Sequence, residues 1–350
     1  ICERGRFPVV TQSKNSLIDG YSEEESKLVP KAFLPLLVFG DHTRFLKYVD
    51  FQFIVGADGT KLIRPKDDGF VNCSYLYYVL RALVPETKDR GYSRHFQFLK
   101  KLMIPVPPIH EQCRIVDRVE ELLSEINRAE KAYEELQTLA GVLRGQILQE
   151  AIQGKLVPQM AEEGVVEQIG VAPDERPFEI PKSWKWRALD EIFKFVDYRG
   201  KTPTKTTDGV RLITASNVRQ GYVDHKRIEF ISSEEYIDRQ NRGISKKGDI
   251  LFTTEAPLGN VALADLDVYS AGQRVITLQT DSENKKLLMY FMLSPYFQKA
   301  LKNNATGTTA QGIKAARLKK LMLPVPPVEE QARIASKVEE LLKQVDALSA

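Results

Sequence analysis

Residue types that often carry enzymatic chemistry occur in this chain, but their spacing matches no catalytic motif. Gly200-Lys201-Thr202 is similar to the end of a phosphate-binding loop, yet Phe195 stands where that loop requires a glycine, so we expect a turn there. No Gly-x-Gly-x-x-Gly and no His-Glu-x-x-His sequence occurs. A Ser-His-Asp set stays compatible with the sequence, but nothing marks a nucleophile. The chain is therefore predicted to bind a partner rather than to catalyse a reaction.

Cysteine usage argues against a metal site or a disulfide framework. The three cysteines, Cys2, Cys73 and Cys113, are odd in number and widely spaced, which is typical of reduced intracellular thiols. None lies at the short distance from another Cys or His that a zinc site requires. We expect no metal and no cofactor in this chain. No apolar run approaches the roughly 20 residues of a membrane span, so we expect a cytoplasmic protein without membrane contact.

Polar loops in the second half of the chain combine the residue types that recognise nucleic acids. Arg pairs with guanine, Asn and Gln pair with adenine, and Lys or Thr anchors phosphate groups. Each single residue could equally be a solvated loop side chain, so the prediction concerns the group. The predicted DNA-binding residues here are Arg199, Lys201, Thr202, Lys205, Asn217, Arg219, Thr306, Thr308, Thr309, Gln311 and Lys314.

The first half carries a comparable but different group of polar residues. Its last members precede a proline-rich segment, as the Thr306 to Lys314 loop does in the second half. Since the two groups differ in sequence, we expect them to read different DNA sequences. The predicted DNA-binding residues of the first half are Arg6, Gln12, Lys14, Arg44, Arg90, Tyr92 and Arg94.

The charge is divided unevenly along the chain. Residues 1–101 contain 16 basic and 12 acidic side chains, a net +4, and residues 182–320 contain 24 and 15, a net +9. Residues 102–181 contain 7 and 15, a net −8, and residues 321–350 contain 3 and 5, a net −2. A polyanion is attracted to the basic parts and repelled by the acidic ones, which indicates nucleic acid bound at two places. Chance variation between solvated surfaces is the alternative.

A repeat organises these parts. Leu99–Pro108 reads LKKLMIPVPP and Leu318–Pro327 reads LKKLMLPVPP, a shift of 219 residues. The same shift superposes Glu111-Gln112 on Glu330-Gln331, and the agreement continues well beyond the prolines. The sequence therefore predicts two copies of one module.

A helix is predicted after each proline segment, because apolar residues then recur alternately every four and three positions. This a/d pattern runs from Ile115 to Ile147, about 50 Å, and starts again at Ile334. We predict that the two helices pair as an antiparallel coiled coil within one chain. A dimer between chains is the alternative. The residues predicted to pack in the seam are Ile115, Val119, Leu122, Ile126, Ile334, Val338, Leu341 and Val345.

The predicted fold class is α+β, with two globular domains of short strands and helices separated by the long helices. Gly154 is placed to cap the first long helix. Strand-like runs are Phe51 to Val55, Val210 to Thr214, Asp249 to Thr253 and Arg274 to Leu278, and helix-like runs are Tyr75 to Leu83 and Leu287 to Leu301. The predicted parts are a first domain (1–108), a helix (109–154), a proline-containing linker (155–182), a second domain (183–327) and a second helix (328–350).

These residues resemble the specificity subunits of type I restriction-modification systems. The resemblance rests on Leu-Pro-Val-Pro-Pro-x-x-Glu-Gln-x-Arg-Ile with its long helix, on the helix ending Gln153 to Pro158, and on the Thr-Gly-Thr-Thr-x-Gln-Gly-Ile-Lys loop ahead of Leu318. The first domain departs from the family in lacking the opening segment that the second has at Trp184 to Phe195, and the second helix stops after Leu348. We therefore expect a chain shortened at both ends.

The resemblance implies two target recognition domains, each reading one half of a bipartite site in double-stranded DNA. It implies that the helices set the gap between the halves and dock modification (methyltransferase) subunits, with a separate restriction (translocase/endonuclease) subunit. S-adenosylmethionine, ATP and Mg²⁺ would then belong to those partners, and this chain would not be an enzyme. A non-enzymatic coiled-coil adaptor that binds proteins is the alternative function. The DNA sequence recognised does not follow from these residues.

Overall fold

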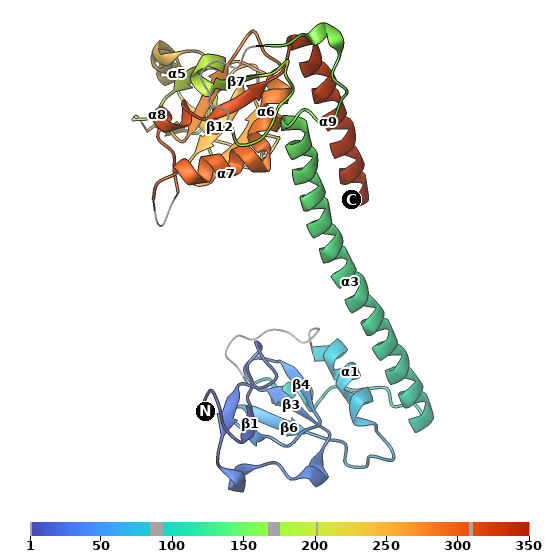
Figure 1. The fold of residues 1–350 in the computed structure, drawn as a ribbon. Coiled ribbons are helices and arrows are strands. Elements are labelled where there is room, and N and C mark those ends of the chain that lie inside the picture. Colours follow the sequence, from blue (N-terminus) through green and yellow to red (C-terminus); the bar gives the residue numbers. More distant parts are fainter. Residues whose placement is uncertain (1, 85–93, 167–175, 201, 308–310, 350) are drawn as a thin grey trace. The chain divides into compact units, whose positions relative to one another are not determined.

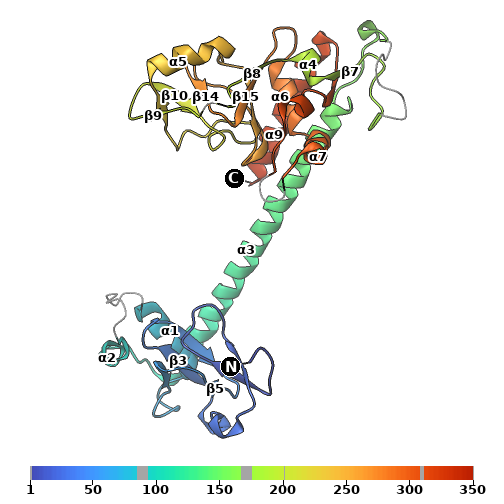
Figure 2. The ribbon, with the colours of Figure 1, turned by 90° about the vertical axis from the view of Figure 1, so that its left-hand side faces the viewer.

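The structure is a computed structural model that describes residues 2–84, 94–166, 176–200, 202–307 and 311–349. The chain divides into two compact units, Ile1–Ala132 and Tyr133–Ala350, here called the first and the second unit. Figures 1 and 2 show the ribbon from two directions. In the described part of the chain no helix is both long and apolar enough to span a bilayer.

The first unit contains two three-stranded sheets and the helices α1 and α2. One sheet has the strand order β2-β1-β5 and the other has the order β4-β3-β6. The helix α1 packs on the second sheet, where Leu37, Phe39 and Leu76 are buried in one core. The elements are β1 (Phe7–Val10), β2 (Gly20–Ser22), η1 (Glu25–Lys27), η2 (Lys31–Phe33), β3 (Leu36–Gly40), β4 (Leu46–Val49), β5 (Ile54–Val55), β6 (Thr60–Ile63), α1 (Cys73–Leu83) and α2 (Phe96–Leu99).

The second unit contains larger sheets with the orders β13-β12-β15-β8 and β14-β10-β11-β9, and a third sheet of β16 and β7. Its main core buries Trp184, Phe252 and Phe291 between the first of these sheets and the helices. The elements are η4 (Ala161–Glu163), β7 (Lys185–Ala188), α4 (Leu189–Ile192), β8 (Lys194–Asp197), β9 (Lys205–Thr206), β10 (Val210–Ile213), β11 (Phe230–Ile231), α5 (Ser233–Arg239), η6 (Gln240–Arg242), β12 (Ile250–Thr254), β13 (Leu258–Leu263), β14 (Ser270–Ala271), β15 (Val275–Gln279), α6 (Lys285–Leu293), α7 (Pro295–Asn304), α8 (Ala315–Leu318), β16 (Met322–Val325) and α9 (Val328–Ser349).

The two units share one topology in the part where their sequences diverge. In the first unit β1 pairs antiparallel with β2 and parallel with β5, and β3 pairs antiparallel with β4 and β6. In the second unit β10 pairs in the same way with β11 and β14, and β12 with β13 and β15. The order along the chain is also the same, and α1 and α6 follow at equivalent places. The prediction of two copies of one module therefore extends beyond the repeated segments.

A buried glutamine fixes the repeated segment to its domain in both units. The backbone N–H of Asn72 donates to Gln112 Oε1 (2.8 Å), and Gln112 Nε2 donates to the Pro107 carbonyl (2.7 Å). In the second unit the backbone N–H of Asn284 donates to Gln331 Oε1 (2.6 Å). Both asparagines also cap the helix that they precede, α1 or α6. This contact explains why the Glu-Gln pair is part of the repeat.

The long helix α3 (Ile109–Ile152) begins directly after Pro108, as predicted. At its other end the N–H of Lys155 donates to the Glu150 carbonyl (3.0 Å) and the N–H of Gly154 donates to the Ala151 carbonyl (3.1 Å). This pair of bonds is a Schellman motif with Gly154 at φ +70°. A Cβ on Gly154 would lie 2.4 Å from Pro181 Cγ, so the predicted glycine cap is also required for packing.

The last turns of α3 and the helix α9 lie side by side and antiparallel in the second unit (Figure 1). Gln137 Nε2 donates to the Ser349 carbonyl (3.0 Å), and Arg144 forms an ion pair with Asp346. Residues near the end of α9 thus lie beside the middle of α3. The buried apolar residues between the helices include Ala140, Ile147, Ile334, Val338 and Val345, and Leu341 is partly buried. The predicted antiparallel pairing within one chain is confirmed for this stretch.

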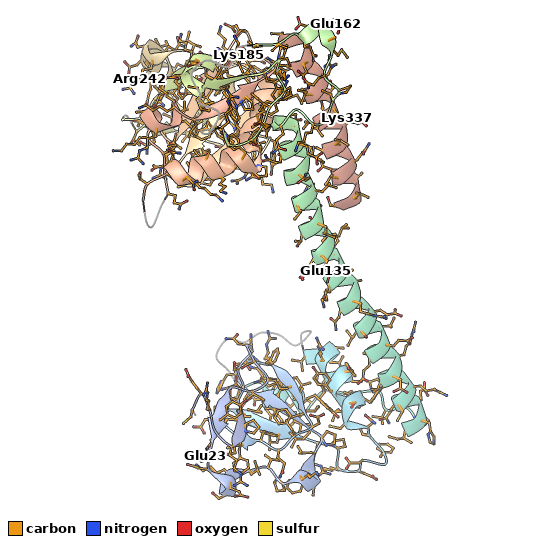
Figure 3. All side chains as sticks on the ribbon, in the orientation of Figure 1. Glu23, Glu135, Glu162, Lys185, Arg242 and Lys337 are labelled. Atoms are coloured by element: carbon orange, nitrogen blue, oxygen red, sulfur yellow. The ribbon has the colours of Figure 1, made fainter. Side chains whose placement is uncertain are left out.

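The first part of the predicted seam is not covered. Ile115, Leu122 and Ile126 are exposed at 36%, 40% and 52%, and Val119 is half-buried. Residues 124–139 of α3 are all exposed, including Glu135 in Figure 3. In the described structure these four residues are exposed or half-buried, so their predicted packing against the second helix is not observed and stays a prediction.

Two predicted elements differ from the structure by more than two residues. The helix expected from Leu287 to Leu301 is broken into α6 and α7, because Pro295 has no N–H and disfavours helical backbone before it. Ser294 accepts a hydrogen bond from the Phe297 N–H (3.3 Å) and so caps α7. The strand expected from Phe51 to Val55 is only β5, two residues long.

The linker is partly fixed to the second unit through a buried carboxylate. Glu330 Oε2 accepts from Trp184 Nε1 (2.7 Å), and Glu330 Oε1 accepts from Gln159 Nε2 (2.6 Å). Burial raises the pKa of Glu330, against the opposing effect of these two hydrogen bonds. Arg333 pairs with Glu163 (2.6 Å) one turn along α9. The Trp-led segment is therefore anchored to the start of the second repeated helix.

Candidate nucleic-acid interface

Four loops converge at one edge of the second unit. Because β10 and β14 are parallel, the loops that follow them, Thr214–Asn217 and Gly272–Arg274, leave at the same edge. The antiparallel pairing of Thr253 with Val275 brings the β12–β13 turn, residues 255–257, to this edge as well. The segment before α8 joins them, since the N–H of Ile313 donates to the Thr254 carbonyl (3.0 Å). We call this edge the loop edge of the second unit.

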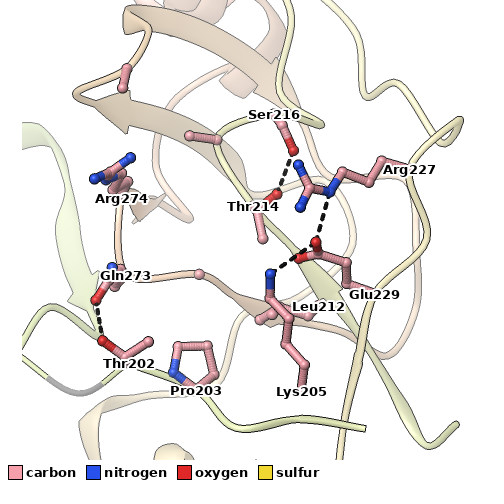
Figure 4. Close-up of a pocket in the computed structure, with 13 residues that line it drawn as sticks. Thr202, Pro203, Lys205, Leu212, Thr214, Ser216, Arg227, Glu229, Gln273 and Arg274 are labelled. Carbon is pink, nitrogen blue, oxygen red and sulfur yellow. Dashed lines mark hydrogen bonds and ion pairs between the residues drawn. The ribbon is translucent and has the colours of Figure 1, made fainter. Parts of the chain in front are cut away.

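One hollow of about 390 Å³ opens at the loop edge and is lined by two cations around one carboxylate. Lys205 Nζ and Arg227 Nε both contact Glu229 Oε1, at 2.9 and 2.7 Å (Figure 4). Burial opposes ionisation of Glu229, but hydrogen bonds from Lys205 and Arg227 hold its pKa below the ordinary value. Thr202 Oγ1 lies 2.9 Å from Gln273 Oε1 on the other side (Figure 4). The local surplus of positive charge suits a phosphate backbone.

A second hollow of about 420 Å³ adjoins the first, and Gln273 and Arg274 line both. Its cations include Arg199 and Lys314. Arg199 is held by Asp197, with Nη2 2.6 Å from Oδ2, and its Nη1 donates to the Ile313 carbonyl (3.4 Å). Arg199 thus connects the end of β8 with the segment before α8.

The loop that carries Thr306 is closed at its base. The N–H of Thr306 donates to the Gly312 carbonyl and the N–H of Gly312 donates to the Thr306 carbonyl, each at 2.9 Å. Gly312 also forms a β-bridge with Glu255, in the β12–β13 turn. The base of the loop is therefore fixed against the neighbouring turn of the loop edge.

Backbone strain occurs at the equivalent turn of both units. Ala256, between β12 and β13, has φ +43°, and Arg44, between β3 and β4, has φ +56°. A left-handed conformation costs a residue with a side chain about 1–2 kcal/mol. These are the two non-glycine residues with positive φ in the described ranges of the chain. Strained residues concentrate at functional sites, which supports this edge as the site.

The equivalent loops of the first unit also converge. The N–H of His42, in the β3–β4 turn, donates to Gln12 Oε1 (3.2 Å), and Gln12 Nε2 donates to the Asp58 carbonyl in the β5–β6 loop (3.0 Å). The N–H of His95, before α2, donates to the Asp41 carbonyl (2.9 Å). The loop edge of the first unit is thus built from the same four places in the fold, with different side chains.

The comparison with known families agrees with this duplication. Residues 1–137 and 181–349 each match the family described as the type I restriction modification DNA specificity domain. The chain belongs to this family. Its two specificity domains are therefore the two globular parts whose topology repeats.

Named relatives are specificity subunits of type I restriction enzymes. The EcoAI subunit of Escherichia coli is 24% identical over 325 aligned positions, which cover 72% of this chain and 55% of that subunit. The MjaVIII subunit of Methanocaldococcus jannaschii is 27% identical over 294 positions, which cover 78% of this chain and 63% of that subunit. The EcoR124I/EcoR124II subunit of Escherichia coli is 26% identical over 373 positions, which cover 98% of this chain and 80% of that subunit. This chain thus spans little more than half of the EcoAI subunit.

Two solved structures have a similar fold. A chain from a structure concerned with complex assembly and conformational transition of the type I R-M system has 20% identity and a TM-score of 0.68, covering 98% of this chain and 85% of that chain. The HsdS subunit from Thermoanaerobacter tengcongensis has 19% identity and a TM-score of 0.57, and the match covers 98% of this chain and 84% of that chain.

The loop edges of the two specificity domains contain many of the predicted DNA-binding residues. Arg199, Thr202, Lys205, Thr306 and Lys314 line the two hollows of the second domain. In the first domain the predicted residues that fall on the equivalent loops are Gln12, Lys14, Arg44 and Arg94. The predicted residues Lys201, Thr308, Thr309, Arg90 and Tyr92 lie outside the described residues.

The prediction that Asn217 contacts DNA is wrong. Its side chain is fully buried, Oδ1 accepts from the Thr214 N–H (3.0 Å) and hydroxyl (2.9 Å), and Nδ2 donates to the carbonyls of Asp224 (2.9 Å) and Arg227 (2.8 Å). All four hydrogen-bonding positions of the amide are filled. Asn217 therefore shapes the loop edge and does not face a ligand.

Four other predicted residues lie apart from the two hollows or already use their side chains in contacts within the chain. Arg6 precedes β1 at the end opposite to the loop edge and pairs with Glu25 (3.7 Å). Arg219 pairs with Asp224 (3.6 Å) and lines neither hollow of the loop edge. Gln311 is exposed and borders a separate hollow beside Ala256. Of the first-domain residues, Gln12 uses both ends of its amide to hold neighbouring loops.

Sequence reasoning missed three residues of the loop edge. Gln273 and Arg274 line both hollows, and Arg274 Nε lies 2.7 Å from Glu255 Oε1. Arg274 was predicted to be a strand residue, whereas β15 begins at Val275. The glycine at 272 before two long polar residues was the available signal for a loop. Within the described residues, no group of three or more His, Cys, Asp or Glu could hold a metal ion.

Proposed function

We propose that this chain is the sequence-specific DNA-binding subunit of a type I restriction-modification complex, with each specificity domain reading one half of a bipartite site. The observation that carries the proposal is the repetition of one loop edge on one topology with different side chains. A shared scaffold with variable loops suits two readers of different sequences.

The charges of the second loop edge support contact with double-stranded DNA. Lys205 and Arg227 share one carboxylate, and Lys314 is an exposed cation on the adjoining hollow. Cations of this kind contact phosphates, while Thr202, Gln273 and Arg274 have groups suited to base edges.

The chemistry would belong to partner subunits. Modification subunits would methylate and a restriction subunit would translocate and cleave, and S-adenosylmethionine, ATP and Mg²⁺ would bind to those subunits. The exposed stretch of α3, residues 124–139, offers a surface for the modification subunits. This chain would then be non-catalytic and would act in the cytoplasm, where the DNA is.

Binding of labelled duplex DNA to the full chain at increasing salt concentrations tests the proposal. Since neutralised phosphates release counterions, the logarithm of the binding constant should fall steeply and linearly with the logarithm of the salt concentration. Binding that is absent, or that hardly depends on salt, would favour the protein-binding adaptor instead.

Exchange of one domain tests the modular reading. Replacing residues 183–317 by the corresponding region of another specificity subunit should change one half of the methylated site in cells that also express the partner subunits. The reciprocal exchange of residues 1–98 should change the other half. Methylation mapping reads both outcomes, and a change of both halves by either exchange would contradict the proposal.

A further inference from the structure

We propose that Arg274 and Glu255 together read one G·C base pair in the half-site contacted by the second specificity domain. This inference rests on the proposed function, and it names the two side chains that would give this domain a defined base preference. Neither residue was expected at the site from the sequence.

The position of the pair suits a reader of base edges. Arg274 and Glu255 line the second hollow, and Arg274 also lines the first, so the arginine stands on the ridge between the two. The cations that suit phosphates, Lys205, Arg227 and Lys314, lie on either side of this ridge. DNA held by those cations would present a groove to the ridge.

The backbone around the pair is held in place. The Arg274 carbonyl accepts from both the N–H (3.0 Å) and the hydroxyl (3.3 Å) of Thr254, and the N–H of Val275 donates to the Gly272 carbonyl (3.0 Å). Glu255 forms a β-bridge with Gly312 and precedes Ala256. Two reading side chains fixed to a rigid edge lose little freedom when they bind, which favours a defined preference.

The side chains of Arg274 and Glu255 are half-exposed, and the ion pair between them restrains both. Arg274 Nε lies 2.7 Å from Glu255 Oε1, and the side chains are 49% and 45% exposed. In the described part of the chain, the two terminal guanidinium nitrogens of Arg274 have no hydrogen bond, and the second carboxylate oxygen of Glu255 has none either. The guanidinium of Arg199, by contrast, donates hydrogen bonds to Asp197 and to the Ile313 carbonyl.

The donor and acceptor order of the pair is complementary to a G·C pair. Guanine presents two acceptors, N7 and O6, in the major groove, and its partner cytosine presents the N4 donor beside them. A guanidinium next to a carboxylate offers donors next to an acceptor in the same order. An A·T pair places a donor between two acceptors, so Arg274 would face the adenine N6 donor. The pair should therefore reject A·T.

Selection from a library of duplexes with randomised bases, bound by the full chain and then sequenced, tests the inference. The wild-type chain should enrich G·C at one position of one half-site. Arg274→Gln should reduce that preference about 10- to 100-fold, the range for one good bidentate base contact, and should leave the other positions unchanged. Glu255→Gln should weaken the preference at the same position, because an amide no longer offers only acceptors.

Arg227→Gln is the matched control. Arg227 also pairs through Nε with a glutamate at 2.7 Å, and its removal costs the same charge, but it lies beside Lys205 on a shared carboxylate. This variant should weaken binding to all sequences by a common factor without a change of base preference. Unfolding followed by fluorescence should show that all three variants fold, as expected for half-exposed or exposed residues.

The outcomes separate this inference from the proposed function. An unchanged base preference in Arg274→Gln, or changes at two different positions in the two pair variants, would overturn the inference while DNA reading stands. Failure of the wild-type chain to select any sequence would remove the proposed function and this inference with it.

Discussion

At the scale of single residues, buried polar side chains determine the shape of the loop edge. Asn217 holds the segment after β10 through four hydrogen bonds, and Thr254 holds Arg274 through its backbone carbonyl. These residues are buried, and the exposed residues depend on them for position. Substitution of such a residue should therefore affect stability as well as binding.

We expect Asn217→Ala to lower the free energy of unfolding of the second unit by about 2–4 kcal/mol, because it leaves buried groups without partners. Both tryptophans of the chain, Trp184 and Trp186, lie in this unit, so tryptophan fluorescence during urea denaturation reports on it alone. Arg219→Gln is the control and should cost less than about 1 kcal/mol, since its ion pair is long at 3.6 Å and its side chain is 40% exposed. Equal costs for both substitutions would contradict this account.

The buried carboxyl of Glu330 predicts a pH dependence. Its pKa is raised above the ordinary 4.5 by burial, so the folded state binds the proton more strongly than the unfolded state. Its contribution is fully present below about pH 4.5 and is lost as the pH rises through the higher pKa of the folded state. We expect Glu330→Gln to reduce the loss of stability between pH 4 and pH 7, measured by urea denaturation at both values. An identical loss in both proteins would contradict this assignment.

At the scale of elements, the repeated helices are fixed by the same local rules but differ in environment. Gln112 and Gln331 form the same contact with a helix-capping asparagine. The glutamate beside Gln331, Glu330, also binds Trp184 and Gln159, whereas among the described residues the equivalent Glu111 of the first copy is exposed. Helical periodicity predicted where both helices begin. The same periodicity runs through the exposed and the buried parts of α3, so it did not predict which residues of the seam are covered.

Two glycines of α3 give opposite predictions. Gly154 has φ +70° and its Cβ would clash with Pro181, so Gly154→Ala should destabilise the second unit by at least about 1 kcal/mol. Gly141 lies inside the helix with nothing within 4 Å of a Cβ, so Gly141→Ala should stabilise by about 0.5–1 kcal/mol. Urea denaturation measures both, and a stabilising Gly154→Ala would show that the cap is not required.

At the scale of the whole molecule, α3 connects the two specificity domains in the chain and has about 66 Å of helix. Its length is a candidate ruler for the gap between half-sites. The exposed stretch 124–139 allows this length to be changed without touching a core.

Insertion of seven residues after Glu130 should lengthen the helix by about 10.5 Å and rotate its end by only about 20°. We expect the gap in the methylated site to grow by about three base pairs, at 3.4 Å each, while both half-sites stay the same. Methylation mapping in cells with the partner subunits measures this. Altered half-sites with an unchanged gap would defeat the ruler idea.

The sequence by itself determined the features that depend on near neighbours in the chain. It predicted the start of α3 after Pro108, the cap at Gly154, the duplicated module and a group of polar loops, because periodicity, capping and repetition are local signals. The family resemblance drew on the same repeated segments and is confirmed for most of the chain.

Only the tertiary structure decided which loop residues meet. Strand pairing joined Glu255 to Arg274 across 19 positions, buried Asn217, and gave both units one topology although their loops differ. Short strands carry little periodicity of their own, and their partners lie far away in the sequence. The donor-rich loops could therefore be predicted from composition, but the pair of Arg274 and Glu255 at the second hollow could not.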